Sequence, residues 1–378
     1  MAKDKRILVF EPRPDGHHPK WAALVSESLT GIGYQVTLAT TVPERVQSHL
    51  TNEKNIDIRK IDPVNGVAEL AVADSLRESL DADEVYWTSL DNFASSLLRS
   101  ATIGKRPPLG LKGKIAGVYH RPRPIDPDQS GLGTSVKRHG FKKLYEENWW
   151  SRINVLDPQV AEIAESLYPN LPIQLICDPA AFPKLPAKSE ARAALKVPGD
   201  KIALLHFGVY AKRKGLGLLL EALEECPARE KFFLLRAGKA PTDAPEAEKV
   251  KALANTGLAL SLDYFVDSET EAKLYAAADI VTLPYLSHYG SANLLSAAAA
   301  AQRPVLASDH HLLGRQVKDN KLGWRFNDRN ASDLAKVLEQ IASEWDKEQD
   351  TFKTSLQQYA QRCNYEAFHK SIAQLYAS

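Results

Sequence analysis

The sequence predicts an α/β protein made of two Rossmann-like, doubly wound domains that face each other across a cleft. Short apolar runs alternate with longer helix-like runs along the chain, which is typical of parallel sheets covered by helices. The chain has 378 residues, enough for two hydrophobic cores. The proline-bearing stretch 178–186 interrupts the alternation. We therefore predict one domain over residues 1–178, a second over 187–345, and terminal helices within 346–378.

The first strand–helix–strand unit of the N-terminal domain is the clearest. Residues 7–10 form an apolar strand, and a loop with proline and glycine follows. Pro19 suits the first turn of the next helix, where a missing N–H costs nothing, and residues 31–33 (Gly-Ile-Gly) end that helix. Residues 34–39 form the second strand. The remaining elements expected in this domain are strands over 56–61, 84–87, 115–119, 153–156 and 173–176 and helices over 66–80, 91–101 and 158–168.

Two stretches have a less regular pattern. Residues 121–143 combine proline, glycine and basic residues with little periodicity, and we interpret them as a long loop that runs into a helix containing Trp149 and Trp150. In the C-terminal domain, alanines 297–301 favour a helix. Ser291 or Asn293 is expected to cap that helix, because Ser and Asn side chains accept hydrogen bonds from unpaired backbone N–H groups.

The C-terminal domain repeats the alternation of the first. An extended segment is expected to begin at Pro304, and two helices end the chain, over 348–362 and 365–376. The other elements expected here are strands over 202–207, 231–236, 258–262, 280–283 and 322–326 and helices over 216–225, 247–255, 269–277 and 332–345.

Composition excludes several classes of function. The 48 Lys and Arg residues balance 47 Asp and Glu residues, so no overall field favours nucleic acid. Cys177, Cys226 and Cys363 lie far apart and fit no metal-ligand spacing, and we expect reduced thiols. No apolar run reaches the roughly 18 residues of a membrane span, and the first apolar run is too short for a signal peptide. These features favour a cytoplasmic protein.

Ligands of doubly wound sheets bind outside the carboxyl ends of the strands, so the candidate residues lie in the loops that follow strands. The loop after strand 202–207 contains Gly208, Arg213 and Lys214. Glycine lets a backbone approach a phosphate, and Arg and Lys supply counter-charge. The alternative is a solvated basic turn.

The loop after strand 280–283 is rich in hydroxyl and imidazole groups. It feeds a helix start, where unpaired N–H groups and the helix dipole favour anions. The candidate ligand-binding residues in this loop are Ser287, His288, Tyr289, Gly290 and Ser291.

Two loops of the N-terminal domain contain further candidates. His120 follows strand 115–119 and can donate a hydrogen bond to a sugar or act as an acid or base; the alternative is a packed core histidine. Gly16 permits close approach of the first loop to a ligand, and His17 and His18 can line it. The alternative is plain loop structure, since two adjacent histidines lack a third metal ligand.

No metal site is predicted. Asp81-Ala82-Asp83 has the spacing of a metal–diphosphate motif but lies at the entrance of a strand, where a helix-to-strand turn explains it better. Asp126-Pro127-Asp128 is no stronger a candidate. The basic stretch 138–143 can contact anionic lipid head groups at a membrane surface or an anionic acceptor; the alternative is an ordinary solvated face.

These motifs together resemble the GT-B glycosyltransferases, specifically the GT4-like retaining group whose C-terminal domain is called glycosyl transferases group 1. Gly208 and Lys214-Gly215 match the turn whose cations bind the donor diphosphate. His120 matches a histidine that contacts the donor sugar, and Gly16 matches the glycine of the acceptor-side loop. The segment 283–305 matches the one that holds the family's Glu-x7-Glu pair. The terminal helices fit the family's habit of crossing back over the N-terminal domain.

The chain departs from the family pattern at this pair. The two glutamates, which contact the donor hexose and grip the donor ribose, fall on Tyr289 and Ala297. The family's arginine after the first glycine falls on Val209, although Arg213 can supply the charge, and Gln302 replaces a glycine before Pro304. Contacts to the nucleoside and hexose therefore have to come from other groups.

The resemblance implies a retaining, metal-independent hexosyltransferase of glycan biosynthesis, with an acceptor-side N-terminal domain and a nucleotide-sugar donor domain after it. No cofactor is implied beyond the nucleotide-diphosphate sugar as co-substrate, and the acceptor is an unknown glycan or small molecule. A GT-B-like scaffold without transfer activity, serving as a sugar-binding partner subunit, stays open because the glutamates are missing. A sugar-nucleotide epimerase is less favoured, because the sequence reveals no carboxylate and histidine set.

Overall fold

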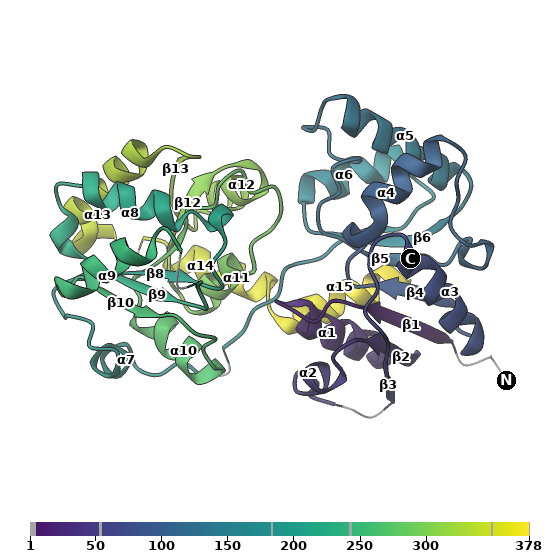
Figure 1. Ribbon diagram of the computed structural model, residues 1–378, viewed down its shortest axis with the longest axis horizontal. Helices are drawn as coiled ribbons and strands as arrows, with labels where there is room; N and C mark the ends of the chain where they lie inside the picture. Colours follow the sequence, from purple (N-terminus) through teal and green to yellow (C-terminus); the bar gives the residue numbers. More distant parts are fainter. Residues whose placement is uncertain (1–4, 53–54, 183, 242–243, 349–350, 378) are drawn as a thin grey trace. The chain divides into compact units, whose positions relative to one another are not determined.

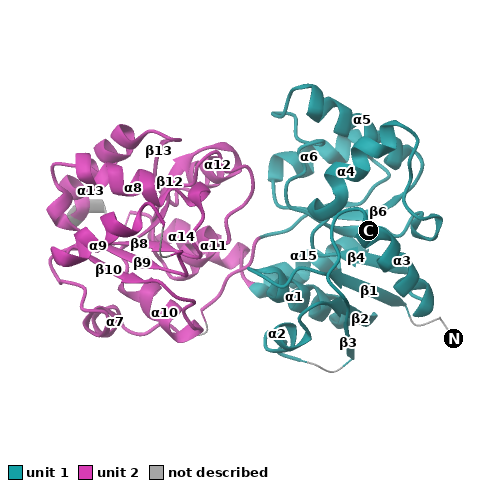
Figure 2. Ribbon diagram, in the orientation of Figure 1, with its two compact units in different colours: residues 1–177, 365–378 teal, residues 178–364 magenta. Residues whose placement is uncertain are grey.

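The computed structural model describes residues 5–52, 55–182, 184–241, 244–348 and 351–377. The chain forms two compact units (Figure 2). Unit 1 comprises Met1–Cys177 together with Tyr365–Ser378, and unit 2 comprises Asp178–Asn364. The chain therefore leaves unit 1 and returns to it at the C-terminal end.

Unit 1 is built on a seven-stranded parallel sheet in the order β3-β2-β1-β4-β5-β6-β7 (Figure 1). The strand order reverses between β1 and β4, the switch point where ligands of such sheets bind. The strands are β1 (Arg6–Glu11), β2 (Gln35–Thr40), β3 (Ile56–Lys60), β4 (Glu84–Trp87), β5 (Ile115–Tyr119), β6 (Trp150–Val155) and β7 (Ile173–Leu175). The helices are α1 (His18–Gly31), α2 (Pro43–Gln47), α3 (Ala68–Ser79), α4 (Asp91–Thr102), α5 (Leu132–Glu146), α6 (Pro158–Leu167) and α15 (Tyr365–Ala377).

The apolar sequence of β1 reflects helices on both faces of the sheet. Ile7 and Val9 point into one buried cluster, and Leu8 and Phe10 point into another on the opposite face. Successive residues of a strand alternate between faces, so a strand buried on both sides is apolar at every position.

The C-terminal helix α15 packs against α1, which confirms the expected return of the chain to the N-terminal domain. The rings of Trp21 and Phe368 meet edge to face at 5.1 Å. Ser28 Oγ lies 2.7 Å from Nδ1 of His369. The preceding helix, α14 (Lys353–Arg362), packs instead against α11 (Asn293–Ala300) of unit 2.

The interpretation of residues 121–143 as a long loop before a tryptophan-bearing helix is wrong. The helix α5 begins at Leu132, and Trp150 begins strand β6. Phe141 of α5 stacks on Trp150 at 5.3 Å, so the tryptophan packs under the helix. Gly140 allows α5 to lie directly on α4, because a Cβ there would be 1.9 Å from the Leu98 carbonyl oxygen.

Unit 2 has a six-stranded parallel sheet in the order β10-β9-β8-β11-β12-β13, with its order reversal at β8 and β11. The two parallel sheets confirm the predicted fold class. The strands are β8 (Ile202–Phe207), β9 (Phe232–Ala237), β10 (Ala259–Leu262), β11 (Ile280–Leu283), β12 (Val305–Asp309) and β13 (Gly323–Asn327). The α-helices besides α11 and α14 are α7 (Lys188–Ala194), α8 (Leu216–Glu225), α9 (Ala247–Asn255), α10 (Ser268–Ala277), α12 (His311–Asp319) and α13 (Ala331–Glu348).

The predicted cap of the alanine-rich helix is wrong. Ala292 is the N-cap residue of α11, and no side chain caps this helix. Asn293 Nδ2 instead donates to Asp178 Oδ1 at 3.0 Å and to the Pro179 carbonyl at 3.0 Å. The asparagine thus fastens α11 to the segment that enters unit 2.

Candidate functional site

Two loops at the switch point of unit 2 hold the predicted donor-binding residues together. Gly215, in a left-handed conformation (φ 70°), lies so close to the β11 loop that a Cβ would be 1.8 Å from the Pro284 carbonyl oxygen. The Leu286 N–H donates to the Arg213 carbonyl at 2.8 Å. The loops after β8 and β11 therefore form one hydrogen-bonded surface.

The Lys214 ammonium lies over the backbone of Gly208. A Cβ at Gly208, which has a φ of 108°, would be 2.2 Å from Lys214 Nζ. Gly238, after β9, has a φ of 128° and supports the arrangement, because a Cβ there would be 2.3 Å from the Gly208 carbonyl oxygen. The absence of side chains at Gly208 and Gly238 thus makes room for the Lys214 ammonium.

Positive charge is concentrated around this ammonium. Burial, followed by the cations of Arg213 and Arg236, lowers the pKa of Lys214 to about 8. Arg236 is buried and pairs with Asp263. Within the described part of the chain no carboxylate pairs with Lys214, so an anion bound here would supply its missing counter-charge.

A buried histidine supports the same turn without adding charge. His206 of β8 donates from Nε2 to the Lys214 carbonyl at 3.2 Å. Burial is the main cause that lowers its pKa to about 4, so the imidazole is neutral at physiological pH.

The side chains predicted to contact the donor sugar are engaged within unit 2. Ser287 (φ 46°) donates from its backbone N–H and from Oγ to Asp328, at 3.1 and 3.2 Å. His288 donates from Nε2 to the Ser291 carbonyl at 2.9 Å. Tyr289 is 7% exposed, and its ring lies 4.2 Å from that of His311. The loop is therefore internally braced.

The last residues of this loop are buried or hydrogen-bonded within unit 2, and the position of the second family glutamate is held by a buried alanine. Gly290 is buried, and Ser291 Oγ contacts Asp178 at 3.4 Å. Ala297 is 4% exposed within α11. The carboxylates of Asp328 and Asp178 thus both touch the loop, and neither lies on a family position.

In unit 1, four candidates lie at the carboxyl end of the sheet. Gly16 has a φ of 61°, and a Cβ added to it would meet no atom within 4 Å, so the first loop is open there. The exposed ring of His17 stacks on His18 at 4.7 Å and meets His120 at 5.9 Å. The structure thus brings these histidines together.

The hydrogen bonds of His120 restrict its chemistry. Its Nε2 donates to the Thr88 carbonyl at 3.0 Å, and its backbone N–H donates to Asp91 Oδ2 at 2.8 Å. Burial, followed by the nearby His17, lowers the pKa of His120 to about 3. The ring is therefore neutral, and its Nδ1 can accept a hydrogen bond but cannot donate a proton.

Sequence reasoning missed a buried carboxylate and histidine pair in this unit. Glu11 ends β1, is fully buried, and bonds His18 Nδ1 at 2.8 Å. The side chain of Thr88, after β4, donates to the same carboxylate. A search for polar residues directly after each predicted strand would have found Glu11.

A second missed carboxyl group lies close by. Glu69, in the first turn of α3, is 1% exposed, and burial is the main cause that raises its pKa to about 8. The negative charge of Glu11 also raises the pKa of Glu69. Helix periodicity gave no signal for a buried acid at this position.

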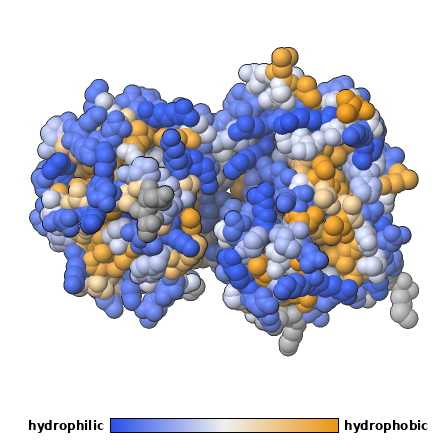
Figure 3. Space-filling model, in the orientation of Figure 1, coloured by the Kyte–Doolittle hydropathy of each residue, from blue (hydrophilic) through white to orange (hydrophobic). Residues whose placement is uncertain are grey.

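The basic stretch 138–143 is partly structural. Arg138 donates to three backbone carbonyls of the preceding loop, and Phe141 is fully buried. His139 and Lys142 are exposed. Apolar side chains also gather over the α5 region (Figure 3), and Leu132 is 89% exposed. In the described segments, no helix has the length and apolar character that crossing a membrane requires.

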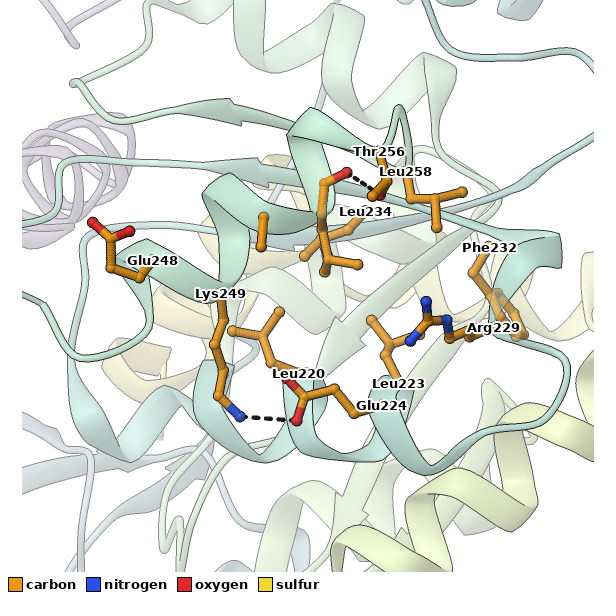
Figure 4. A pocket seen from close by; sticks show the side chains of 12 residues that line it. Leu220, Leu223, Glu224, Arg229, Phe232, Leu234, Glu248, Lys249, Thr256 and Leu258 are labelled. Carbon is orange, nitrogen blue, oxygen red and sulfur yellow. Dashed lines mark hydrogen bonds and ion pairs between the residues drawn. The ribbon is translucent and has the colours of Figure 1, made fainter.

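A pocket of about 360 Å³ lies elsewhere in unit 2, between α8 and α9 (Figure 4). Leu220, Leu223 and Phe232 line its apolar interior, and an ion pair of Lys249 with Glu224 at 2.9 Å closes one side. Its strand residues, Phe232 and Leu234, lie in the amino-terminal half of β9, away from the predicted donor loops, and no predicted site residue lines it.

The two doubly wound units and the loops at their switch points define a protein of the GT-B fold. The structure is similar to sucrose-phosphate synthase from Thermosynechococcus elongatus (16% identity, 99% and 98% of the two chains covered, TM-score 0.71) and to a glycosyltransferase from Rickettsia africae (16%, 99% and 98%, 0.70). It is also similar to HepE from Anabaena in complex with UDP (14%, 99% and 99%, 0.68), which has likewise been solved with UDP-glucose.

Residues 187–358 match the family model described as Glycosyl transferases group 1. A comparison with curated proteins gives no match. This match confirms the resemblance of the C-terminal domain to that family.

Proposed function

We propose that the chain transfers a sugar from a nucleotide-diphosphate sugar to a hydroxyl acceptor, without a metal ion. Unit 2 is the donor side in this proposal, and unit 1 is the acceptor side. The observation that carries it is the Lys214 ammonium, which is lodged over Gly208 and has no carboxylate partner among the described residues. The complexes of HepE with UDP and UDP-glucose support the choice of ligand.

Lys214 and Arg213 neutralise the diphosphate as it leaves, which is where negative charge develops during transfer. Backbone N–H groups at Gly290 and Ser291 add donors at the same loop surface. His120 accepts a hydrogen bond from a sugar hydroxyl through Nδ1. This role is narrower than acid catalysis, since Nε2 already donates to Thr88. Hexosyl transfer with retention of configuration is part of the proposal and is supported by the family.

The donor-sugar contacts must differ from the Glu-x7-Glu arrangement, because Tyr289 and Ala297 stand at those positions and both are buried. Ser287, His288 and Tyr289 are proposed to contact the donor sugar after the loop gives up some internal bonds. Asp328 would then lose the Ser287 donors and could accept bonds from sugar hydroxyls.

The test is thermal unfolding of the full chain with UDP, GDP, ADP and TDP. A ligand that binds only the folded state stabilises it by RT ln(1+[L]/Kd), about 2.7 kcal/mol at a concentration of one hundred times Kd. Lys214→Ala should weaken binding of the responding nucleotide about tenfold to a hundredfold, because a charge-assisted hydrogen bond contributes about 1.5–3 kcal/mol.

Lys212→Ala is the matched control, since Lys212 is an exposed lysine of the same turn. Its nucleotide shift should equal that of the wild-type chain. If nucleotide stabilised Lys214→Ala and the wild-type chain equally, Lys214 would not be part of the binding site.

A second candidate is a GT-B scaffold without transfer activity that acts as a sugar-binding partner subunit. The absence of both glutamates favours it, since neither Tyr289 nor Ala297 supplies a carboxylate to accept hydrogen bonds from hexose and ribose. This candidate predicts no stabilisation by any of the four nucleotides, and a stable partner in a pull-down from the native extract. Turnover of any nucleotide sugar would exclude it.

A further inference from the structure

Glu11 is a fully buried carboxylate held by three donors. The Arg13 N–H bonds Oε1 at 2.8 Å, His18 Nδ1 lies 2.8 Å from Oε2, and the Thr88 hydroxyl also donates to Oε2. A buried carboxylate is costly unless it is paired, so this arrangement places strong constraints on the groups around it.

The chief constraint falls on His18. An ionised carboxylate can only accept hydrogen bonds, so the proton of a neutral His18 ring resides on Nδ1 and the lone pair resides on Nε2. Among the described residues no group bonds Nε2, and the side chain keeps 12% of its surface exposed. His18 therefore presents a hydrogen-bond acceptor in a fixed orientation.

The pair lies where a ligand of unit 1 would bind. Glu11 ends β1 and Thr88 follows β4, the two strands between which the sheet order reverses. Gly16 leaves the neighbouring loop open. By contrast, the exposed ring of His17 stacks on His18 and meets the rings of Trp21 and His120.

We propose that His18 Nε2 binds the hydroxyl group of the sugar or polyol acceptor, and that Glu11 is a positioning residue that fixes the imidazole for this contact. The inference rests on the proposed glycosyl transfer. It assigns to the acceptor side a carboxylate and histidine pair that sequence analysis did not find.

The first readout needs no substrate. In the full chain labelled with ¹⁵N-histidine, the neutral form of the His18 ring should hold its proton on Nδ1 and not on Nε2. In Glu11→Gln the amide can donate or accept, so both tautomers should be populated. A wild-type ring with its proton on Nε2 would overturn the proposal.

The second readout is transfer from the nucleotide sugar that binds best, with glycerol and free monosaccharides as acceptor probes. His18→Gln should lower kcat/KM for the acceptor about tenfold, the effect of one lost hydrogen bond, while the nucleotide Kd stays unchanged. Glu11→Gln should also lower kcat/KM for the acceptor.

His49→Gln is the control, because it removes an exposed imidazole of the same unit and leaves the Glu11 pair intact. Its acceptor kinetics should equal those of the wild-type chain. Equal losses for His49→Gln and His18→Gln would overturn the assignment, as would a His18→Gln chain with unchanged acceptor kinetics.

The two proposals fail in different ways. A chain that binds none of the nucleotides fails the proposed function, and the tautomer measurement still decides whether Glu11 orients His18. A chain that binds a nucleotide but transfers to none of the probes counts against the hydroxyl-binding role of His18.

Discussion

Replacing Gly215 with alanine should separate the two loops that form the donor-side surface. A Cβ at this position would be 1.8 Å from the Pro284 carbonyl oxygen, and both groups belong to the backbone, so no flexible side chain can move to relieve the overlap. The φ of 70° also disfavours any residue with a Cβ.

The cost can be worked from these two effects. A left-handed conformation costs roughly 1–2 kcal/mol for an L-residue, and overpacking adds about 1–3 kcal/mol. The sum of about 2–5 kcal/mol corresponds to a fall in Tm of roughly 4–20 °C for a unit of this size. Separation of the loops should also weaken binding of the nucleotide that stabilises the wild-type chain, at least as much as Lys214→Ala does.

The assay is thermal unfolding with and without that nucleotide. Gly199→Ala is the control, because a Cβ at Gly199 meets no atom within 4 Å. A Gly215→Ala chain with the wild-type Tm and the wild-type nucleotide affinity would refute the argument that close backbone contact holds the two loops together.

Three further predictions concern unit 1. Phe368→Ala removes the ring that packs on Trp21 and should cost about 3–5 kcal/mol, measured by urea unfolding, and an unchanged midpoint would contradict the packing of α15. The folded-state pKa of Glu69, about 8, lies above its ordinary value of 4.5, so the folded form holds an extra proton and loses stability between these pH values. Glu69→Gln should therefore flatten the fall in stability from pH 5 to pH 8, and an unchanged slope would place the carboxyl outside the core. The folded-state pKa of His120, about 3, lies below its ordinary value of 6.5, so between these values the ring binds a proton in the unfolded chain but not in the folded chain, and stability falls as the pH falls. The His120→Gln chain should therefore lose less stability than the wild-type chain between pH 6.5 and pH 4.

The sequence predicted the strands well because their apolar runs are bounded by glycine, proline or charge. Residues 7–10 and 202–207 lie within β1 and β8 as expected. The wrong interpretation of residues 121–143 has a physical cause. Helix α5 buries only a few residues, among them Gly140 and Phe141, so its pattern over 132–146 is too weak to read without the strand beneath it.

The candidate site was predictable to a different degree in each unit. Gly208 and Lys214 could be paired in advance because glycine and lysine recur in one loop of known type. The partnership of Glu11 with Thr88 could not, since 77 positions separate them and only the sheet order brings their strands together. Tyr289 was predicted to contact the donor sugar, and its burial follows from His311, in a helix that sequence analysis did not find.

The return of α15 to unit 1 affects how the chain is made. Residues 1–177 leave the ribosome first, yet the hydrophobic side of α1 around Trp21 stays uncovered until α15 emerges. Unit 2 lies between these segments and is continuous in sequence, so it can complete its core earlier although its synthesis begins later. The N-terminal unit, whose synthesis begins first, is therefore the unit whose core is completed last.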